Sequence, residues 1–330
     1  MKNFIEIPTN MAGIYTLSIR WVIGWTYFSA FWRRLILENK LIPEEAGYIG
    51  EKFNHFLPNA LGIKPVIEYL VSNPDALQFA MVIFTIIEAI VGLFIILGLF
   101  TRLMSIGVIM LATGILLGSG WLGTTCLDEW QIGILGIAGG FTIFLTGSGK
   151  YSMDRLLIKK KIKFTNSKWF HYLGSGTIPI KNINHFSLIS SIIIISITLF
   201  TNQYFHGGVW GKLHNKSVKP KVVMANIHFT DSKLKFEVFR TEGADVYGSF
   251  LIGIQILDKN AKVVKNISQL ELASFPLENI NNHYVAKVKP GMHSLILPLG
   301  AKADITLNLD KLFIEKGYMI KLIENPHEKK

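Results

Sequence analysis

The chain has 330 residues, of which 50% are hydrophobic, 12% aromatic and only 17% charged. A soluble globular protein of this length carries about a quarter charged residues, so the composition indicates membrane spans joined to a water-soluble part. The single cysteine excludes an internal disulfide and a cysteine-rich zinc or iron–sulfur site. The formal net charge is +11, but the main basic run lies beside apolar stretches, which favours a membrane-orientation signal over nucleic-acid binding.

Long apolar stretches before residue 205 predict membrane-spanning helices, each near the roughly 20 apolar residues that a bilayer requires. The first four predict a helical bundle. The fifth is charge-free and is equally compatible with a signal-anchor helix and with another bundle helix. The expected spans cover residues 14–32, 77–100, 103–120, 130–146 and 186–200.

Basic residues predict the orientation of these spans, because Lys and Arg are enriched in cytoplasmic loops. The segment between the fourth and fifth spans carries a basic run: Lys150, Arg155, Lys159, Lys160, Lys161, Lys163, Lys168 and Lys181. We therefore expect a multi-pass protein of the cell membrane with a cytoplasmic N-terminus. The loop 33–76, the turn at Cys126 and the C-terminal domain are then extracytoplasmic.

From Pro220 onward the hydrophobic pattern changes to period two, which is typical of β-strands. In ADITLNLD, the apolar Ala303, Ile305 and Leu307 share one face of the expected strand. The stretch SFLIGIQILDKNAKVV predicts two strands joined by a hairpin at 258–260. Several short strands with turn signals predict an all-β, sandwich-like domain.

The expected fold is therefore a membrane α-helical bundle of four helices plus a fifth anchor helix, followed by an all-β sandwich-like extracytoplasmic domain. The bundle takes residues 1–158, and a basic cytoplasmic linker takes 159–184. The anchor helix follows at 185–205 and the β domain at 206–330.

Two ionisable residues lie inside the expected spans, Arg20 in the first and Glu88 in the second. Charges at such depth are usually paired or functional. Counted from the outer ends of their spans at about 1.5 Å per residue, both lie roughly 16–18 Å deep, which predicts that they pair. Such a pair is compatible with a packing role and with a quinone or proton path. Nearby, Trp21 and Trp25 either wall a flat apolar ligand or face lipid.

The outer rim of the bundle combines basic, acidic and thiol groups. Arg33 and Arg34 end the first span, where they can bind a small oxyanion through paired hydrogen bonds or extend to lipid headgroups. Cys126 is a nucleophile if a cation stabilises its thiolate, and otherwise a small buried hydrophobe. Asp128 and Glu129 can handle protons or orient the arginines.

The β domain contains His228, His283 and His293, which raises the question of a metal site. A blue-copper site requires a cysteine ligand, and this domain has none. Histidines without tight spacing are usually surface or structural residues, so no metal is expected.

Several motifs resemble a known family. GLFTRL at 98–103 and GSGKYSMDRLL at 147–157 are similar to the DoxX/DoxD group of four-helix membrane proteins. The loop sequence GYIGEKFNHFLPN and the turn GWLGTTCLDEWQIG resemble DoxD, known as the large subunit of thiosulfate:quinone oxidoreductase. The part from about residue 183 onward resembles DoxA, the small subunit. The chain therefore looks like a DoxD–DoxA fusion.

The resemblance implies that two thiosulfates are oxidised to tetrathionate outside the membrane and that two electrons pass to a membrane quinone. On this hypothesis Cys126, Asp128 and Glu129 are catalytic, and Arg33, Arg34 and His55 bind thiosulfate. The expected quinone pocket contains Arg20, Trp21, Trp25, Glu88, Trp121 and Trp130. The quinone type, whether ubiquinone, menaquinone or caldariellaquinone, stays open.

No glycine-rich nucleotide loop beside a strand and no haem attachment motif is present, so neither flavin nor haem is expected as a cofactor. The expected partners are thiosulfate, quinone and the lipid bilayer, without nucleic acid. A terminal quinol oxidase and a homo-oligomer are further compatible partners. A non-enzymatic DoxX-like membrane scaffold and a quinone reductase for another small sulfur compound remain as alternatives. The chemistry also has two routes, through a cysteine adduct or by direct attack of thiosulfate on the quinone.

Overall fold

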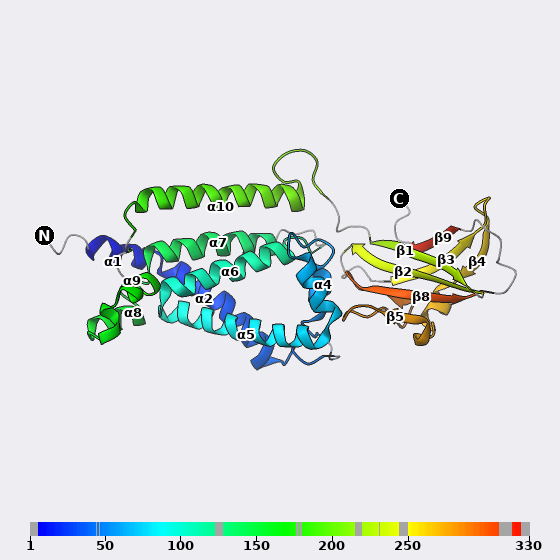
Figure 1. Ribbon diagram of the computed structural model, residues 1–330, viewed down its shortest axis with the longest axis horizontal. Helices are drawn as coiled ribbons and strands as arrows, with labels where there is room; N and C mark the ends of the chain where they lie inside the picture. Colours follow the sequence, from blue (N-terminus) through cyan, green and yellow to red (C-terminus); the bar gives the residue numbers. More distant parts are fainter. Residues whose placement is uncertain are drawn as a thin grey trace. The chain divides into compact units, whose positions relative to one another are not determined.

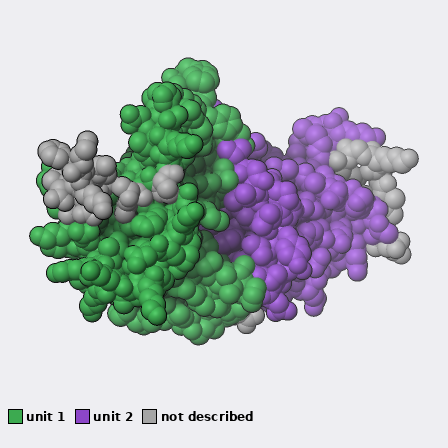
Figure 2. Space-filling model, turned by 60° about the vertical axis from the view of Figure 1, so that its left-hand side comes forward, with its two compact units in different colours: residues 1–49, 78–120, 127–213 green, residues 50–77, 121–126, 214–330 purple. Residues whose placement is uncertain are grey.

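The computed structural model describes residues 6–43, 45, 47–122, 128–175, 178, 180–214, 220–230, 232–243, 250–309 and 319–324. The chain forms two compact units, which Figure 2 shows in different colours. Unit 1 contains residues 1–49, 78–120 and 127–213, and unit 2 contains residues 50–77, 121–126 and 214–330.

Unit 1 is helical (Figure 1). It contains α1 (Glu6–Tyr15), α2 (Leu17–Phe31), the π-helix η1 (Trp32–Leu37), α5 (Pro74–Leu97) from residue 78 onward, α6 (Thr101–Ser119), α7 (Asp128–Thr146) and α10 (Ile183–His206). Within the described residues, 4 helices are long and apolar enough to cross a membrane, namely α5, α6, α7 and α10. The first expected span is instead a 15-residue α-helix that continues directly into the π-helix.

Small residues set the packing of α2 against α5. Gly24 lies against Gly92 and Ile96, and Gly92 lies against the backbone of Phe28, so a Cβ at either glycine would overlap its neighbour. The two helices are therefore antiparallel, with their backbones in close approach. The bundle core around this contact consists of Tyr27, Val91, Ile95, Val108, Leu111 and Ile143.

Helix α10 lies along α7 (Figure 1). Phe186 contacts Phe141 near one end, and the indole Nε1 of Trp130 donates to the Thr201 hydroxyl at 3.0 Å near the other. None of the most apolar 18-residue window of α10 is buried. Because such a surface is stable only in an apolar solvent, the helix suits a lipid-facing position.

The basic segment after α7 is partly helical, with α8 (Met153–Lys159), the 3₁₀ helix η2 (Lys163–Asn166) and α9 (Lys168–Leu173). The Phe170 side chain of α9 is fully buried and contacts Phe100 and Phe164 edge-on. The lysines of the run are exposed. The expected linker thus contains helices that pack by their aromatic residues and leave their charges in solvent.

Unit 2 contains a β-sandwich. One sheet has the strand order β1-β2-β8-β5, and the other has the order β4-β3-β7-β6 with β9 also paired to β3. The strands are β1 (Lys221–Thr230), β2 (Lys233–Glu242), β3 (Phe250–Leu257), β4 (Val263–Ile267), β5 (Ile280–Asn282), β6 (Lys289–Pro290), β7 (Leu295–Ile296), β8 (Lys302–Asn308) and β9 (Met319–Glu324).

Both sheets contribute to one core, which includes Phe236 and Ile305 from the first sheet and Leu251 and Ile254 from the second. Buried side chains alternate with more accessible ones along β8, as the period-two pattern predicts. The hairpin between β3 and β4 is also confirmed, with the Asp258 carboxylate accepting from two backbone N–H groups of its turn. The helical membrane part and the β domain are therefore as expected.

Two short helices from the first half of the chain, α3 (Glu51–Phe56) and α4 (Lys64–Ser72), belong to unit 2. Leu57, Ile67 and Val71 form a buried cluster with Tyr284 of the β domain. The Asn54 amide is fully buried, donates to the Gly300 carbonyl at 3.2 Å and accepts from the Ala286 N–H at 3.1 Å. The segment 50–77 thus shares a hydrophobic core with the sandwich.

Tyr284 also forms a polar contact with this segment. Its hydroxyl donates to the Glu68 carboxylate at 2.7 Å. Burial and this bond to an anion raise the pKa of the tyrosine above its ordinary value. The phenol therefore stays a donor, which fastens α4 to the loop after β5.

Candidate functional site: a buried ion pair beside an apolar cavity

The π-helix η1 places two adjacent arginines in different environments. Arg33 is exposed, and its Nε donates to the Ser29 carbonyl at 3.3 Å. The Arg34 side chain is only 15% exposed and turns toward α5. A π-turn changes the angular spacing of side chains relative to an α-helix, and such turns are frequent at functional sites.

Arg34 forms a buried ion pair with Glu88 of α5. The Arg34 Nη1 lies 2.6 Å from the Glu88 Oε2, and the carboxylate side chain is 4% exposed. The same Nη1 donates to the Thr85 hydroxyl at 3.2 Å, and the guanidinium lies 5.8 Å from the centre of the Phe84 ring. The negative charge inside α5 is thereby balanced by a cation from η1, as a charge removed from water requires.

The expected Arg20–Glu88 pair is wrong. Arg20 is also buried, but it donates to the carbonyls of Tyr151 at 2.6 Å and of Ser148 and Ile96. The reason is the register of the two helices, because Gly24 packs against Gly92 and Ile96 and so places Arg20 beyond them, toward Gly98. The depth estimate, which was counted from the presumed outer ends of the spans, placed Glu88 at the level of Arg20. In the structure, Glu88 lies about three helical turns away from that level.

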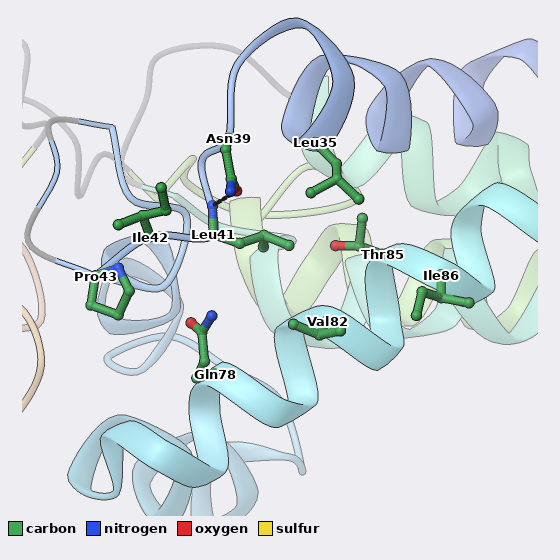
Figure 3. A pocket seen from close by; sticks show the side chains of 9 residues that line it. All are labelled: Leu35, Asn39, Leu41, Ile42, Pro43, Gln78, Val82, Thr85 and Ile86. Carbon is green, nitrogen blue, oxygen red and sulfur yellow. Dashed lines mark hydrogen bonds between the residues drawn. The ribbon is translucent and has the colours of Figure 1, made fainter.

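A cavity of about 320 Å³ adjoins the ion pair (Figure 3). It lies between α5 and the chain that follows η1, and Thr85 belongs both to its wall and to the Arg34 contact. At Asn39 the side-chain carbonyl accepts from the Leu41 N–H at 3.2 Å, which turns the chain back over α5. Its lining consists of Leu35, Asn39, Leu41, Ile42, Pro43, Gln78, Val82, Thr85 and Ile86.

The polar groups of the cavity stand apart from one another. Gln78 and Thr85 lie two turns apart on one face of α5, with Val82 between them. The Gln78 Oε1 accepts from the Tyr48 hydroxyl at 3.2 Å, so the amide nitrogen is the group left to donate. On the α5 side, the cavity wall therefore has an apolar residue between two polar ones.

The aromatic residues of the expected quinone pocket do not gather around this cavity. Trp21 and Trp25 are 50% and 57% exposed on α2, which suits a lipid-facing position. Trp130 lies at the start of α7, against Thr201 and His206 of α10. Trp121 is buried in unit 2.

The other residues singled out from the sequence are only partly described. His55 is half-buried on α3 in unit 2, and Glu129 is half-buried in the first turn of α7. Asp128 begins α7, where its backbone alone is described. Cys126 lies outside the described residues, so its role remains a prediction from the sequence.

Comparison with protein families gives two matches along the chain. A family described as "TQO small subunit DoxD" matches residues 15–181, which is just over half of the chain. The chain belongs to the DoxD family. A second family, "TQO small subunit DoxA", matches residues 205–328. The chain is thus a DoxD–DoxA fusion, and both families are named for thiosulfate:quinone oxidoreductase.

One detail of the resemblance is corrected, because the matching description names DoxD as a small subunit and not as the large one. No solved structure matches the chain. The DoxD match contains the whole Arg34–Glu88 site and its cavity. Together with the long apolar helices, the match identifies a membrane protein.

The DoxD-like motifs GLFTRL and GSGKYSMDRLL contact each other at the end of the helical bundle where α5 ends and α6 begins. The fully buried Asp154 accepts from the backbone N–H groups of Phe100 at 2.8 Å and Thr101 at 3.1 Å. It also accepts from the hydroxyls of Thr101 at 2.9 Å and Ser175 at 2.8 Å. Asp154 therefore caps the N-terminus of α6 from a distant part of the sequence.

Two buried arginines complete this end. Arg102 donates to the carbonyls of Phe144 at 3.2 Å and His171 at 2.7 Å. Arg20 bonds Ile96 and the loop after α7, as described above. Both cations thus satisfy carbonyls at helix ends, which favours a structural role for these DoxD motifs.

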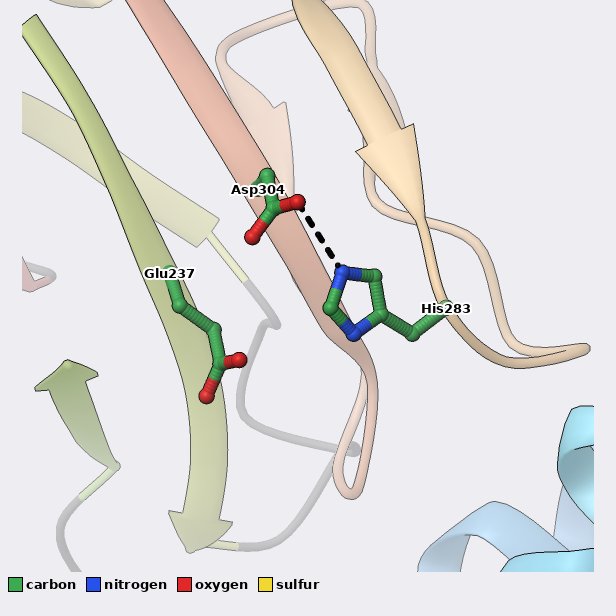
Figure 4. Close-up of side chains that lie close together, drawn as sticks. All are labelled: Glu237, His283 and Asp304. Atoms are coloured by element: carbon green, nitrogen blue, oxygen red, sulfur yellow. Dashed lines mark ion pairs between the residues drawn. The ribbon is translucent and has the colours of Figure 1, made fainter. Parts of the chain in front are cut away.

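In the DoxA part, Glu237, His283 and Asp304 bring potential metal ligands within 4.8 Å of one another (Figure 4). Glu237 and Asp304 are directly opposed on β2 and β8. Each carboxylate already has a lysine partner, Lys302 at 3.2 Å from Glu237 and Lys235 at 3.3 Å from Asp304. The two negative charges are thus balanced by the protein, which favours an ion-pair network.

The electrostatics of Asp304 agree with this description. Partial burial works to raise its pKa, but hydrogen bonds from His283 and Asn281 and the adjacent lysine outweigh it. The pKa is therefore held below its ordinary value of 3.8. The carboxylate stays ionised as the acceptor of the His283 ring, whose Nε2 lies 3.2 Å away.

The residues that the sequence did not identify are Asn39, Gln78, Val82 and Thr85. Gln78 and Thr85 are polar residues inside an apolar helix, and Thr85 precedes Glu88 by three positions. Residues at this spacing share a helix face. That pattern was available from the sequence, whereas the return of residues 39–43 over α5 was not.

Proposed function

We propose that this chain is a membrane thiosulfate:quinone oxidoreductase. Two thiosulfate dianions, one quinone and two protons give one tetrathionate dianion and one quinol, so atoms, charge and electrons balance. The observation that carries the proposal is the succession of two families named for this oxidoreductase, which together span nearly the whole chain. The Arg34–Glu88 pair beside the cavity supports the proposal, because ionisable residues buried in a membrane helix are typical of functional sites.

The orientation belongs to the same proposal. The exposed lysines between α7 and α10 favour a cytoplasmic position for that segment. The ends of α2 and η1, the segment 50–77 and the β domain are then extracytoplasmic. Thiosulfate would be oxidised on that side, and the quinone would enter from the bilayer.

For the anion, the exposed Arg33 is the better candidate of the two adjacent arginines. Arg34 is engaged by Glu88 and Thr85, so its charge is already neutralised. The Arg33 guanidinium is exposed and can form two parallel hydrogen bonds with an oxyanion. His55 remains a second proposed contact of thiosulfate.

Cys126, Asp128 and Glu129 remain the proposed catalytic residues. In the covalent route, the Cys126 sulfur bonds the outer sulfur of one thiosulfate while the two released electrons reduce the quinone. A second thiosulfate then attacks that outer sulfur, releases tetrathionate and restores the cysteine thiolate. In the direct route, thiosulfate attacks the quinone without any cysteine adduct. Asp128 or Glu129 handles the quinone protons in both routes.

The test uses the purified full chain with thiosulfate as the only electron donor. We expect Arg33→Met to raise the thiosulfate KM roughly tenfold or more, because a charge-assisted hydrogen bond contributes about 1.5–3 kcal/mol. Arg155→Met is the matched control, since Arg155 is exposed in the segment proposed to be cytoplasmic. Full turnover by Cys126→Ser would exclude the covalent route. Absence of quinone reduction by folded wild-type protein would contradict the function itself.

A further inference from the structure

The cavity beside the Arg34–Glu88 pair has walls that do not suit a charged substrate. Its polar lining residues, Asn39, Gln78 and Thr85, are uncharged. The adjacent Arg34 is neutralised by Glu88 at 2.6 Å. A dianion entering this cavity would lose its hydration without gaining a net positive partner, which is strongly unfavourable.

The surroundings of the cavity are apolar and exposed. The lining residues Ile42 and Ile86 are 40% and 44% exposed, so the cavity opens to the molecular surface. The neighbouring surface of η1 and α5 is also apolar, with Leu37 69%, Phe79 70% and Ile83 41% exposed. Because α5 is long and apolar enough to cross a membrane, this surface suits lipid. A ligand dissolved in the bilayer therefore reaches the cavity without crossing water.

The pattern of polar groups matches a flat ring with an acceptor at each of two opposite edges. The Gln78 amide and the Thr85 hydroxyl, which belongs to a fully buried residue of the cavity wall, are about 10 Å apart along α5 at 1.5 Å per residue. Val82 and Leu41 lie between them (Figure 3). A quinone has this arrangement, with a carbonyl oxygen on either side of an apolar ring. The 320 Å³ also falls within the range of about 300–1,000 Å³ that is typical of small-molecule sites.

We propose that this cavity binds the head group of the membrane quinone, with Gln78 and Thr85 toward its two carbonyl oxygens and Val82 against the ring. Arg34 lies behind Thr85, where its Nη1 donates to the Thr85 hydroxyl oxygen at 3.2 Å and so fixes the position of that group. The inference deepens the proposed function and rests on it for the class of ligand. The proposal places the quinone away from Trp21 and Trp25. It also separates the quinone from thiosulfate, whose proposed contact is Arg33 outside the cavity.

The experiment is photolabelling of the purified full chain in detergent with a short-chain azido-benzoquinone, followed by mapping of the labelled peptides. We expect label in the segments 35–43 and 78–86, displaced by an excess of the unmodified quinone. Val82→Trp fills the cavity and should reduce labelling at least tenfold. Ile83→Trp is the matched control, because Ile83 is the next residue on α5 and is 41% exposed outside the lining. It should label like the wild type.

Gln78→Leu is the second variant, because it keeps the side-chain size and removes only the amide. We expect severalfold weaker labelling of protein that remains folded, with a somewhat lower unfolding temperature because the hydrogen bond from Tyr48 is lost. Label in other segments, or undiminished labelling of folded Val82→Trp and Gln78→Leu, would overturn the proposal. Specific labelling of the cavity in a protein that shows no thiosulfate-dependent quinone reduction would leave the quinone site standing and refute the proposed function instead.

Discussion

The Arg34–Glu88 pair predicts an asymmetric response to removal of its two partners. Arg34→Met leaves the Glu88 carboxylate without its cation, and that side chain is only 4% exposed. Removal of one partner of a buried pair destabilises a protein by about 3–5 kcal/mol. Glu88→Gln is less severe, because Arg34 is 15% exposed and still bonds Thr85, and the glutamine oxygen can accept in place of the carboxylate. We expect about 1.5–3 kcal/mol, the contribution of one hydrogen bond to a charged group.

The double variant Arg34→Met/Glu88→Met separates the loss of a pair from the loss of packing. It removes both charges and keeps long apolar side chains, so its stability should lie within about 1 kcal/mol of wild type or above it. The assay is equilibrium unfolding in mixed micelles, titrated with SDS and followed by tryptophan fluorescence. Equal destabilisation by the two single variants, or a double variant as unstable as Arg34→Met, would refute the description of a desolvated pair.

Asp154→Ala should destabilise the bundle by at least about 2 kcal/mol in the same titration, because two backbone N–H groups at the start of α6 lose their acceptor. Asn54→Ala should weaken unit 2, and hydrogen exchange at the Ala286 amide, which now donates to Asn54, should rise severalfold; unchanged exchange would contradict the shared core. Asp304→Asn should lower the unfolding temperature at neutral pH. Since the folded pKa of Asp304 lies below its ordinary 3.8, its contribution is present above that value and is lost as pH falls through the folded pKa. The variant and wild type should therefore converge in acid, and a constant difference would exclude the network around Asp304.

Hydropathy and period-two alternation were sufficient to predict the helical membrane part and the β domain, because both follow from which residues must leave water. The turn at Asp258 and the buried face of β8 followed from the same reasoning. The π-helix was not predictable in this way. Arg33 and Arg34 placed the end of the expected first span at residue 32, whereas the helix continues as a π-helix to Leu37.

The candidate site shows the same limit. Arg34 at the end of the first expected span and Glu88 inside the second were both singled out, but their pairing depends on the helix register, which Gly24 and Gly92 set. Hydropathy contains no information on that register. The packing of segment 50–77 with the β domain is likewise long-range, since Asn54 bonds residues more than 230 positions away.

The central claim is that this single chain transfers electrons from thiosulfate to quinone. The most direct measurement follows quinol and tetrathionate together, with purified full-length protein in lipid nanodiscs that contain quinone, after addition of thiosulfate alone. The account predicts one tetrathionate for each quinol formed, with two thiosulfates consumed. Quinol without tetrathionate would indicate a different sulfur product, and neither product from folded protein would contradict the function.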